Sequence, residues 1–221
     1  MDMITVQNLK KYFGEGPRQV KAVDGIDLSM EKGELTAVIG ASGSGKTTLL
    51  NLIGGLYQPT EGTVTVDGVD LGTLREEELT VFRRRRVGFV FQDCSLVPEL
   101  TVRENILLPL ALDGSRPDAA FFEELTCLLG IQKKLDCFPH MLSGGGQQCA
   151  AIARALITRP AVILADEPTG SFDVKTSQNV AGLLKMTVDV FHQTLVMITH
   201  NLELAQLSDR VVRLRDGRVV Q

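Results

Sequence analysis

Apolar and polar residues alternate along the first third of the chain, and this alternation predicts strands. Side chains of a strand point to opposite faces in turn, so period-two spacing indicates a strand with one buried face. The spacing occurs over 4–9, 20–30 and 62–68. The run Leu35–Ile39 is apolar almost throughout, which is typical of a strand buried on both faces. A helix is predicted from Thr47 to Leu56, and a further strand from Val87 to Phe91.

The pattern changes to helical spacing after about residue 96. Leu125, Leu128 and Leu129 recur at the spacing of one helix face, and prolines and glycines punctuate the region. From residue 143 onward, helices alternate with apolar strands. Helices are predicted over 145–158, 174–190 and 201–207, strands over 161–165 and 194–198, and a hairpin over 211–220.

These elements predict an α/β fold with three parts. Strands that alternate with helices form a mostly parallel sheet with helices on both faces. The early strands predict an N-terminal antiparallel β part, and the region from about 96 to 142 predicts an inserted helical subdomain. We therefore expect a single domain over 1–221, with an α/β core built from 1–95 and 143–221.

Composition and charge narrow the classes of protein. The 221-residue chain has a formal net charge of -4, which argues against a nucleic-acid partner, because such proteins are usually basic. No apolar run approaches the roughly 18 residues of a membrane helix, and the N-terminus lacks the pattern of a secretory signal, so a cytoplasmic location is expected. The four cysteines form no Cys-x-x-Cys pair and predict neither disulfides nor zinc.

Residues 40–47 form a glycine-rich loop, Gly-Ala-Ser-Gly-Ser-Gly-Lys-Thr. The loop follows an apolar strand and opens a helix, which is the context of a P-loop NTPase core. Its glycines let backbone N–H groups approach phosphate oxygens, and the helix start adds partial positive charge. Lys46 is predicted to reach the β- and γ-phosphates of ATP, and the Thr47 hydroxyl to bind Mg²⁺. The predicted nucleotide contacts here are Gly40, Ser42, Gly43, Ser44, Gly45, Lys46, Thr47 and Thr48.

Two carboxylates, Asp166 and Glu167, follow an apolar strand. One is predicted to join the Mg²⁺ shell, and the next to polarise a water molecule for in-line attack on the γ-phosphate. Apolar strands often end in a solvated Asp-Glu pair, so the pair is weak evidence by itself. The glycine-rich loop upstream favours the functional interpretation, with Asp166 as a metal ligand and Glu167 as the general base.

A second glycine-rich segment, Ser143-Gly144-Gly145-Gly146, precedes another helix. Ser143 is predicted to cap this helix, and the exposed backbone N–H groups that follow predict a second anion site. The alternative is a plain capped helix. Three consecutive glycines make a poor cap alone, because glycine costs about 1 kcal/mol relative to alanine inside a helix.

Taken together, these motifs resemble those of the ATP-binding cassette (ABC) ATPases. The order is a phosphate loop, Leu-Ser-Gly-Gly, Asp-Glu-Pro-Thr-Gly and Ile-Thr-His, and the resemblance covers the whole chain. Val-Phe-Gln at 90–92 and Leu-Thr-Val-Arg-Glu-Asn-Ile at 100–106 resemble the branch of the macrolide-export, lipoprotein-release and cell-division ATPases. The resemblance implies an ATPase coupled to transport.

The resemblance also implies roles for further residues. Tyr12 matches the aromatic residue that stacks on adenine, although by itself it is an ordinary strand residue. Gln92 matches the glutamine that senses Mg²⁺ and the γ-phosphate, and His200 the histidine that contacts this phosphate. Asp173 matches an aspartate at the dimer interface. The implied metal ligands are Thr47, Gln92 and Asp166, and the implied catalytic residues are Glu167, His200 and Gln92.

The family's architecture implies partners for this chain. Two copies are expected to enclose two ATP molecules, with Ser143, Gly144 and Gly145 of one copy contacting the nucleotide of the other. Closure of this homodimer is expected to drive a separate transmembrane permease or mechanotransmission protein. The subunit is then peripheral on the inner face of the cell membrane.

Departures from the family pattern keep alternatives open. Gly146 stands where glutamine or glutamate is usual, Cys149 where arginine is usual, and Ser171-Phe172 where Asn-Leu is common. A nucleotide-dependent scaffold with weak hydrolysis is therefore one alternative. A soluble ABC ATPase acting on nucleic acid or ribosomes is another. The run Arg83-Arg84-Arg85-Arg86 has two interpretations, a solvated face or a contact with anionic lipid or an acidic partner.

Overall fold

A six-stranded sheet forms the centre of the computed structural model, which describes residues 2–170 and 172–220. Its strand order is β10-β9-β3-β8-β7-β6. The strands are β3 (Leu35–Ile39), β6 (Val87–Val90), β7 (Val162–Asp166), β8 (Thr194–Ile198), β9 (Arg210–Arg215) and β10 (Arg218–Val220). Only the β9–β10 hairpin pairs antiparallel in this sheet, and the other neighbours pair parallel. The carboxyl ends of β3 and β7 therefore lie at the same edge.

A second sheet of four strands is antiparallel, with the order β2-β1-β4-β5. It contains β1 (Asp2–Phe13), β2 (Val20–Glu31), β4 (Glu61–Val66) and β5 (Val69–Asp70). Its apolar residues share one core with helix α1 (Lys46–Ile53) and with part of the large sheet. The alternating pattern of the N-terminal region is thus explained by one face packed on α1 and one face open to solvent.

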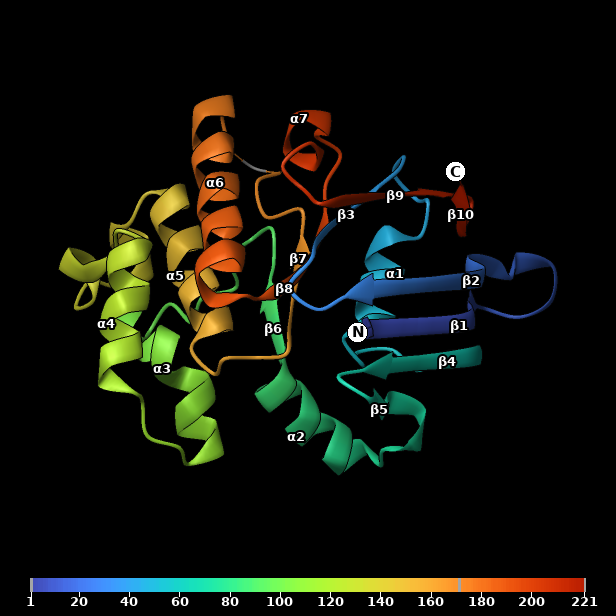
Figure 1. The fold of residues 1–221 in the computed structure, drawn as a ribbon, viewed down its shortest axis with the longest axis horizontal. Coiled ribbons are helices and arrows are strands. Elements are labelled where there is room, and N and C mark those ends of the chain that lie inside the picture. Colours follow the sequence, from blue (N-terminus) through green and yellow to red (C-terminus); the bar gives the residue numbers. More distant parts are fainter. Residues whose placement is uncertain (1, 171, 221) are drawn as a thin grey trace.

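Helices cover the other side of the central sheet. Two of them, α5 (Gly144–Leu156) and α6 (Val174–Phe191), pack with β6, β7 and β8 in a second core. Beyond them lie α3 (Val102–Asp113) and α4 (Ala119–Leu128), at the opposite end of the molecule from the antiparallel sheet (Figure 1). A short helix, α7 (Leu202–Ala205), precedes the final hairpin.

Side-chain caps fix where several helices begin. Thr101 accepts a hydrogen bond from the backbone of Glu104, whose carboxylate binds the Thr101 backbone in return, so α3 starts with a capping box. Asp118 caps α4, and Asp173 caps α6. Four 3₁₀ turns complete the described structure, at Gly16–Arg18, Leu71–Thr73, Gln132–Lys134 and Pro139–Met141.

Helix α2 (Glu76–Arg86) has no counterpart among the sequence predictions. Only Leu79 of this helix is buried, so it has no apolar stripe. Three glutamates in its first turn and four arginines in its last turn complement the helix dipole. This order of charges is the feature of the sequence that indicates a helix here.

The four arginines of α2 form more than a solvated face. Arg84 and Arg85 both bind the carboxylate of Asp113 at the end of α3, with N–O distances of 2.7 and 2.9 Å. Arg83 donates to the carbonyl oxygen of Gly55 at 2.8 Å, and Arg86 pairs with Asp67 at 3.1 Å. Every arginine of the run therefore has a partner within the protein.

The predicted fold class is confirmed. A mostly parallel sheet, an antiparallel β part and a helical region between β6 and α5 are all present. Helix α1 is shorter than predicted, since it ends at Ile53 and not at Leu56. The boundaries assigned to the helical subdomain stay a prediction. No helix in the described residues is long and apolar enough to cross a membrane.

Candidate nucleotide site

The glycine-rich loop joins β3 to α1 as the sequence predicted. Gly43 and Gly45 adopt φ angles of +77° and +99°, a region that residues with a side chain rarely occupy. A Cβ on Gly40 would collide with the Leu214 carbonyl oxygen, and one on Gly45 with the Ala22 carbonyl oxygen. The loop thus depends on glycine because the surrounding backbone leaves no space for a side chain.

Lys46 lies at the first turn of α1 with its ammonium group folded back on the loop. Its Nζ donates to the carbonyl oxygens of Gly40 and Ala41, both at 2.9 Å. The Ser44 hydroxyl is buried nearby and has no hydrogen-bond partner, one of only two such side-chain atoms in the described residues. A buried orphan hydroxyl beside an ammonium and a helix start fits an anionic ligand such as a phosphate.

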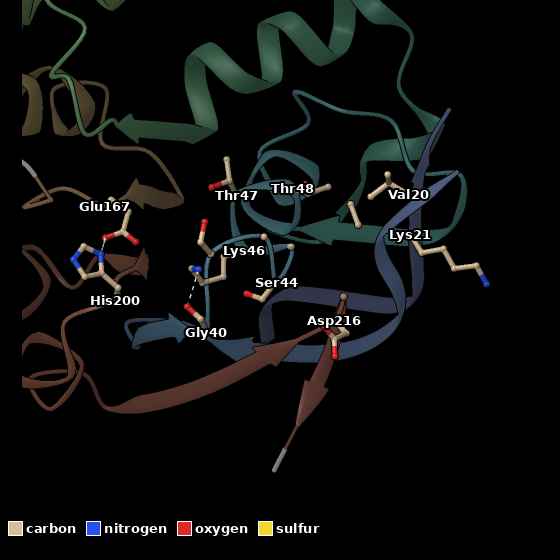
Figure 2. Close-up of a pocket in the computed structure, with 15 residues that line it drawn as sticks. Val20, Lys21, Gly40, Ser44, Lys46, Thr47, Thr48, Glu167, His200 and Asp216 are labelled. Atoms are coloured by element: carbon tan, nitrogen blue, oxygen red, sulfur yellow. Dashed lines mark hydrogen bonds and ion pairs between the residues drawn. The ribbon is translucent and has the colours of Figure 1, made fainter. Parts of the chain in front are cut away.

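These residues line a cavity of about 610 Å³. Figure 2 shows Lys46 and Thr47 at the start of α1, with Glu167 and His200 beside them and Val20, Lys21 and Asp216 at the other side. The cavity brings together most of the predicted contacts, namely Gly40, Ser42, Gly43, Ser44, Gly45, Lys46, Thr47, Thr48, Glu167 and His200. Residues that lie far apart in the sequence thus converge at one edge of the sheet.

Asp166 ends β7, and Glu167 and His200 follow β7 and β8 at this edge. The Thr47 hydroxyl lies 3.3 Å from Asp166 Oδ1, so two of the three predicted metal ligands are adjacent. Burial raises the pKa of Asp166, and the Thr47 hydrogen bond opposes that shift. Glu167 has a φ of +47°, and its Oε2 lies 2.8 Å from Nδ1 of His200. The imidazole thereby orients the carboxylate within the cavity.

Gln92 lies next to the same centre but outside the main cavity. It lines a second hollow of about 420 Å³ together with Asp166, Phe91 and Asp93. Its side chain is exposed at the end of β6, the strand that pairs with β7. The structure therefore brings Gln92 close to Asp166, as the assignment of both to one metal requires.

The second glycine-rich segment opens α5 away from the cavity. Ser143 caps this helix, and its hydroxyl accepts a hydrogen bond from the Gly146 backbone at 3.3 Å. Neither Ser143, Gly144, Gly145 nor Asp173 lines the main cavity. Asp173 caps α6 by accepting from the backbone and hydroxyl of Thr176, at 3.1 and 2.7 Å. Within one copy these residues are therefore separate from the phosphate loop.

Tyr12 lies in β1 and does not line the main cavity. Its hydroxyl donates to Asp24 Oδ1 at 2.5 Å, and Lys21 Nζ lies 5.2 Å from the centre of its ring. Asp24 also pairs with Arg218, at 2.7 Å. The Tyr12 hydroxyl and the Arg218 guanidinium together lower the pKa of Asp24 to about 2. Stacking of Tyr12 on adenine stays a prediction.

The residues at the far side of the cavity were not predicted from the sequence. These are Val20, Lys21, Ala22, Asp216 and Gly217. They come from the start of β2 and from the turn between β9 and β10, and no local motif marks them. Val20 is a large apolar residue that is 60% exposed, which only the structure shows.

The departures from the family pattern have unequal structural settings. A Cβ on Gly146 would meet Leu142 at 3.4 Å, which is an ordinary contact, so a side chain fits there. Cys149, by contrast, is buried in the core around α5, and burial raises its pKa to about 11. An arginine at position 149 would therefore carry its charge into this core. Ser171 lies outside the described residues, and Phe172 packs against Gly144.

Comparison with known proteins decides the family. Residues 23–170 match the model of the ABC transporter family. The chain is 45% identical to a lipoprotein-releasing system ATP-binding protein, LolD, of Geobacter metallireducens, over 99% of this chain and 98% of that one. The chain belongs to the ABC transporter family. It is an ATP-binding and ATP-hydrolysing subunit of the ABC type. The predicted function as a transporter ATPase subunit and the predicted ATPase activity are thereby confirmed.

Other members support the branch and the fold. A macrolide export ATP-binding/permease protein, MacB 1, of Aeromonas hydrophila is 43% identical over 99% of this chain, which spans only 34% of that relative. The solved dimeric structure of the cassette MJ0796 in a post-hydrolysis state, bound to ADP and Pi, superposes with a TM-score of 0.87. It is 37% identical, and the match covers 99% of this chain and 97% of that one. The predicted resemblance to the lipoprotein-release and macrolide-export branch is confirmed.

Proposed function

We propose that this ABC ATPase hydrolyses ATP with Glu167 as general base and that paired copies drive a separate permease. The observation that carries the proposal is the placement of Glu167. Its carboxylate lines the same cavity as the phosphate loop and is held by His200 at 2.8 Å. A base in this position polarises water beside the terminal phosphate of a nucleotide bound by the loop.

Each part of the site has a separate task. The start of α1 and the Lys46 ammonium bind the phosphates, and Lys46 exchanges the Gly40 and Ala41 carbonyl oxygens for phosphate oxygens. Thr47, Asp166 and Gln92 would hold Mg²⁺, because hydroxyl, carboxylate and amide oxygens are the ligands this ion prefers. The ion neutralises phosphate charge when bound.

The Glu167→Gln variant tests the assignment of the base. Glutamine keeps the size of the side chain but cannot accept a proton, so kcat should fall about 10²- to 10⁴-fold. Affinity for a fluorescent ATP analogue should stay near that of the wild type, because Lys46 and the loop are intact. The matched control is Glu124→Gln, an exposed glutamate of α4. Turnover near the wild-type level in Glu167→Gln excludes this base.

A homodimer completes the site. Ser143 and Gly144 are exposed and Gly145 is half-buried, so the start of α5 can contact the nucleotide of a second copy. The solved MJ0796 cassette is dimeric and similar over the whole chain, which supports this arrangement. In the closed dimer, the loop of one copy and the α5 start of the other bind each ATP molecule.

The permease is proposed to dock beside α3. A groove of about 390 Å³ runs between α2, β6 and α3, and its apolar wall includes Leu56, Phe89, Phe91 and Pro109. In the neighbouring segment 96–110, Leu96, Leu107 and Leu110 pack against the core. The groove, and not those three leucines, is therefore the better docking surface. Such docking makes the subunit peripheral on the inner face of the membrane.

Charge at the groove tests the docking site. Leu56 is 43% exposed and lines the groove, whereas Leu207 is similarly exposed but does not. Leu56→Glu should prevent co-purification with the permease from membranes, because a charge would be buried at the interface. Leu207→Glu should leave it unchanged. Equal recovery of the permease with both variants would place the interface elsewhere.

A further inference from the structure

Helix α5 carries two side chains that hold the segment around Gln92, here called the Gln92 segment (residues 91–95). Gln148 is completely buried. Its Nε2 donates to the Phe91 carbonyl oxygen at 3.1 Å, and its Oε1 accepts from the Cys94 thiol at 2.7 Å. The amide nitrogen and oxygen of Gln148 thus both have hydrogen-bond partners, and these partners, Phe91 and Cys94, flank Gln92.

Arg154 holds the same segment from about 1.7 turns further along α5. Its guanidinium donates to the Ser95 carbonyl oxygen at 2.6 Å and to the Cys94 carbonyl oxygen at 2.9 Å. Cys94 and Ser95 both have left-handed φ angles, +60° and +44°. Such angles are unfavourable for residues with side chains and persist where neighbouring groups hold them. Arg154 provides that support by binding both carbonyl groups.

From these contacts we infer that Gln148 and Arg154 are positioning residues that join the Gln92 segment to helix α5. The two residues are six positions apart, about 9 Å along the helix. Helix α5 therefore contacts the Gln92 segment at two separate points. The N-terminus of the same helix begins at Gly144 after its Ser143 cap. Gln92 and the α5 start therefore move together, although they serve different nucleotides in a dimer.

The consequence is a link between the two ATP sites of a dimer. Nucleotide contact at Ser143 fixes α5, and α5 fixes Gln92 beside Asp166 in the other site. The inference rests on the proposed roles of Gln92 and of the α5 start. It adds two residues that touch neither nucleotide nor metal.

A double-mutant cycle tests the inference, with Gln148→Ala combined with Gln92→Ala. Alone, Gln148→Ala should lower kcat about 5- to 150-fold, the usual range for coupling between sites, and bring the Hill coefficient for ATP towards one. In the Gln92→Ala background, the same change should cause no further loss, because the residue acts through Gln92. Nucleotide affinity of the monomer should stay unchanged throughout.

Two further variants separate positioning from general damage. Gln147→Ala is the matched control, since the Gln147 side chain donates to the Leu142 carbonyl oxygen, just before its own helix, and not to the Gln92 segment. Arg154→Lys keeps the charge but loses the paired geometry, so it should show a milder form of the same defect. It also serves if Gln148→Ala fails to fold.

Three outcomes overturn the inference. The first is an additive loss in the double mutant, which means that Gln148 acts independently of Gln92. Equal defects in Gln147→Ala and Gln148→Ala are the second. The third is full activity of Gln92→Ala, which leaves nothing to position. The role of Glu167 is judged separately by Glu167→Gln, so the two proposals fail independently.

Discussion

Two helices of this protein begin with glycine-rich segments, and their glycines are there for different reasons. Before α1, a side chain on Gly40 or Gly45 would strike the backbone of another strand or turn. At the start of α5, Gly144, Gly145 and Gly146 have no positive φ, and a Cβ on Gly146 makes only ordinary contacts. The fold of one copy therefore requires glycine at α1 but not throughout α5.

This difference bears on why glycines occur at the start of α5. The start of α1 faces a cavity within its own chain, so its sequence is explained by contacts inside the structure. At the start of α5, a Cβ would meet Phe172 at 2.8 Å on Gly144 and Thr176 at 3.0 Å on Gly145, so of the three glycines Gly146 alone has room for a side chain. A glycine that its own fold does not need is explained by a close approach from outside, and a second nucleotide-bound copy supplies one.

The largest effect is expected from Gly45→Ala. The new Cβ would collide with the Ala22 carbonyl oxygen, and φ of +99° is itself strained. A cost of about 3 kcal/mol in the binding-competent loop lowers ATP affinity about a hundredfold. Gly43→Ala is the comparison, because it has a φ of +77° but no atom within 4 Å, and its loss should be smaller. Titration with a fluorescent ATP analogue measures both.

Cys149→Arg should mainly affect stability. Cys149 is 7% exposed within the core around α5, so an arginine there becomes a buried charge without a partner. The free energy of unfolding should fall by about 3 kcal/mol, equivalent to roughly 10 °C in Tm for a chain of this size. Cys127→Arg on exposed α4 should change Tm little. An unchanged Tm in Cys149→Arg would show that the core opens to admit the cation.

Gly146→Ala should stabilise the folded protein, whereas Cys149→Arg should destabilise it. Gly146 has no positive φ, and its Cβ would lie 3.4 Å from Leu142, so alanine fits the first turn of α5. Replacing a helical glycine should raise the free energy of unfolding by about 0.5–1 kcal/mol. Gly144→Ala is the contrast, because its Cβ would lie 2.8 Å from the Phe172 ring. Urea unfolding of both variants at neutral pH provides the measurement, and a destabilised Gly146→Ala contradicts the comparison.

The smallest effect is expected from Tyr12→Phe, on the pH dependence of Tm. The Tyr12 hydroxyl contributes most to lowering the pKa of Asp24 to about 2. A carboxyl group with a lowered pKa stabilises the folded state above its unfolded pKa, about 3.9, and that contribution disappears as the pH falls towards 2. Tyr12→Phe should therefore lower Tm slightly at pH 5 and not at pH 2. A constant difference across this range would exclude the hydrogen bond as its cause.

Periodic patterns allowed most of the fold to be predicted from the sequence. The nearly continuous apolar run Leu35–Ile39 became the buried strand β3, and the hairpin predicted over 211–220 became β9 and β10. Helix α2 was not predicted because Leu79 is its single buried residue, and a helix with one buried residue has no hydrophobic periodicity. Its evidence was the order of its charges.

The candidate site divides in the same way. Residues in contiguous motifs, such as Lys46 and Glu167, were predicted, and the structure brings them into one cavity. Lys21 and Asp216 were not, because only the pairing of distant strands places them there. The contact of Gln148 with Cys94 was likewise unpredictable, since it depends on how α5 is rotated against β6. The assigned roles of all the site residues stay predictions.

The attachments of helix α2 have a mechanical consequence. Its last turn is tied to Asp67 near the antiparallel sheet, to Gly55 after α1, and to Asp113 at the tip of α3. The last turn of α2 therefore connects the end of α3 to the antiparallel sheet and to the segment after α1. A displacement of α3 would reach these two parts through the ion pairs of Asp113 and Asp67 and through the hydrogen bond to Gly55.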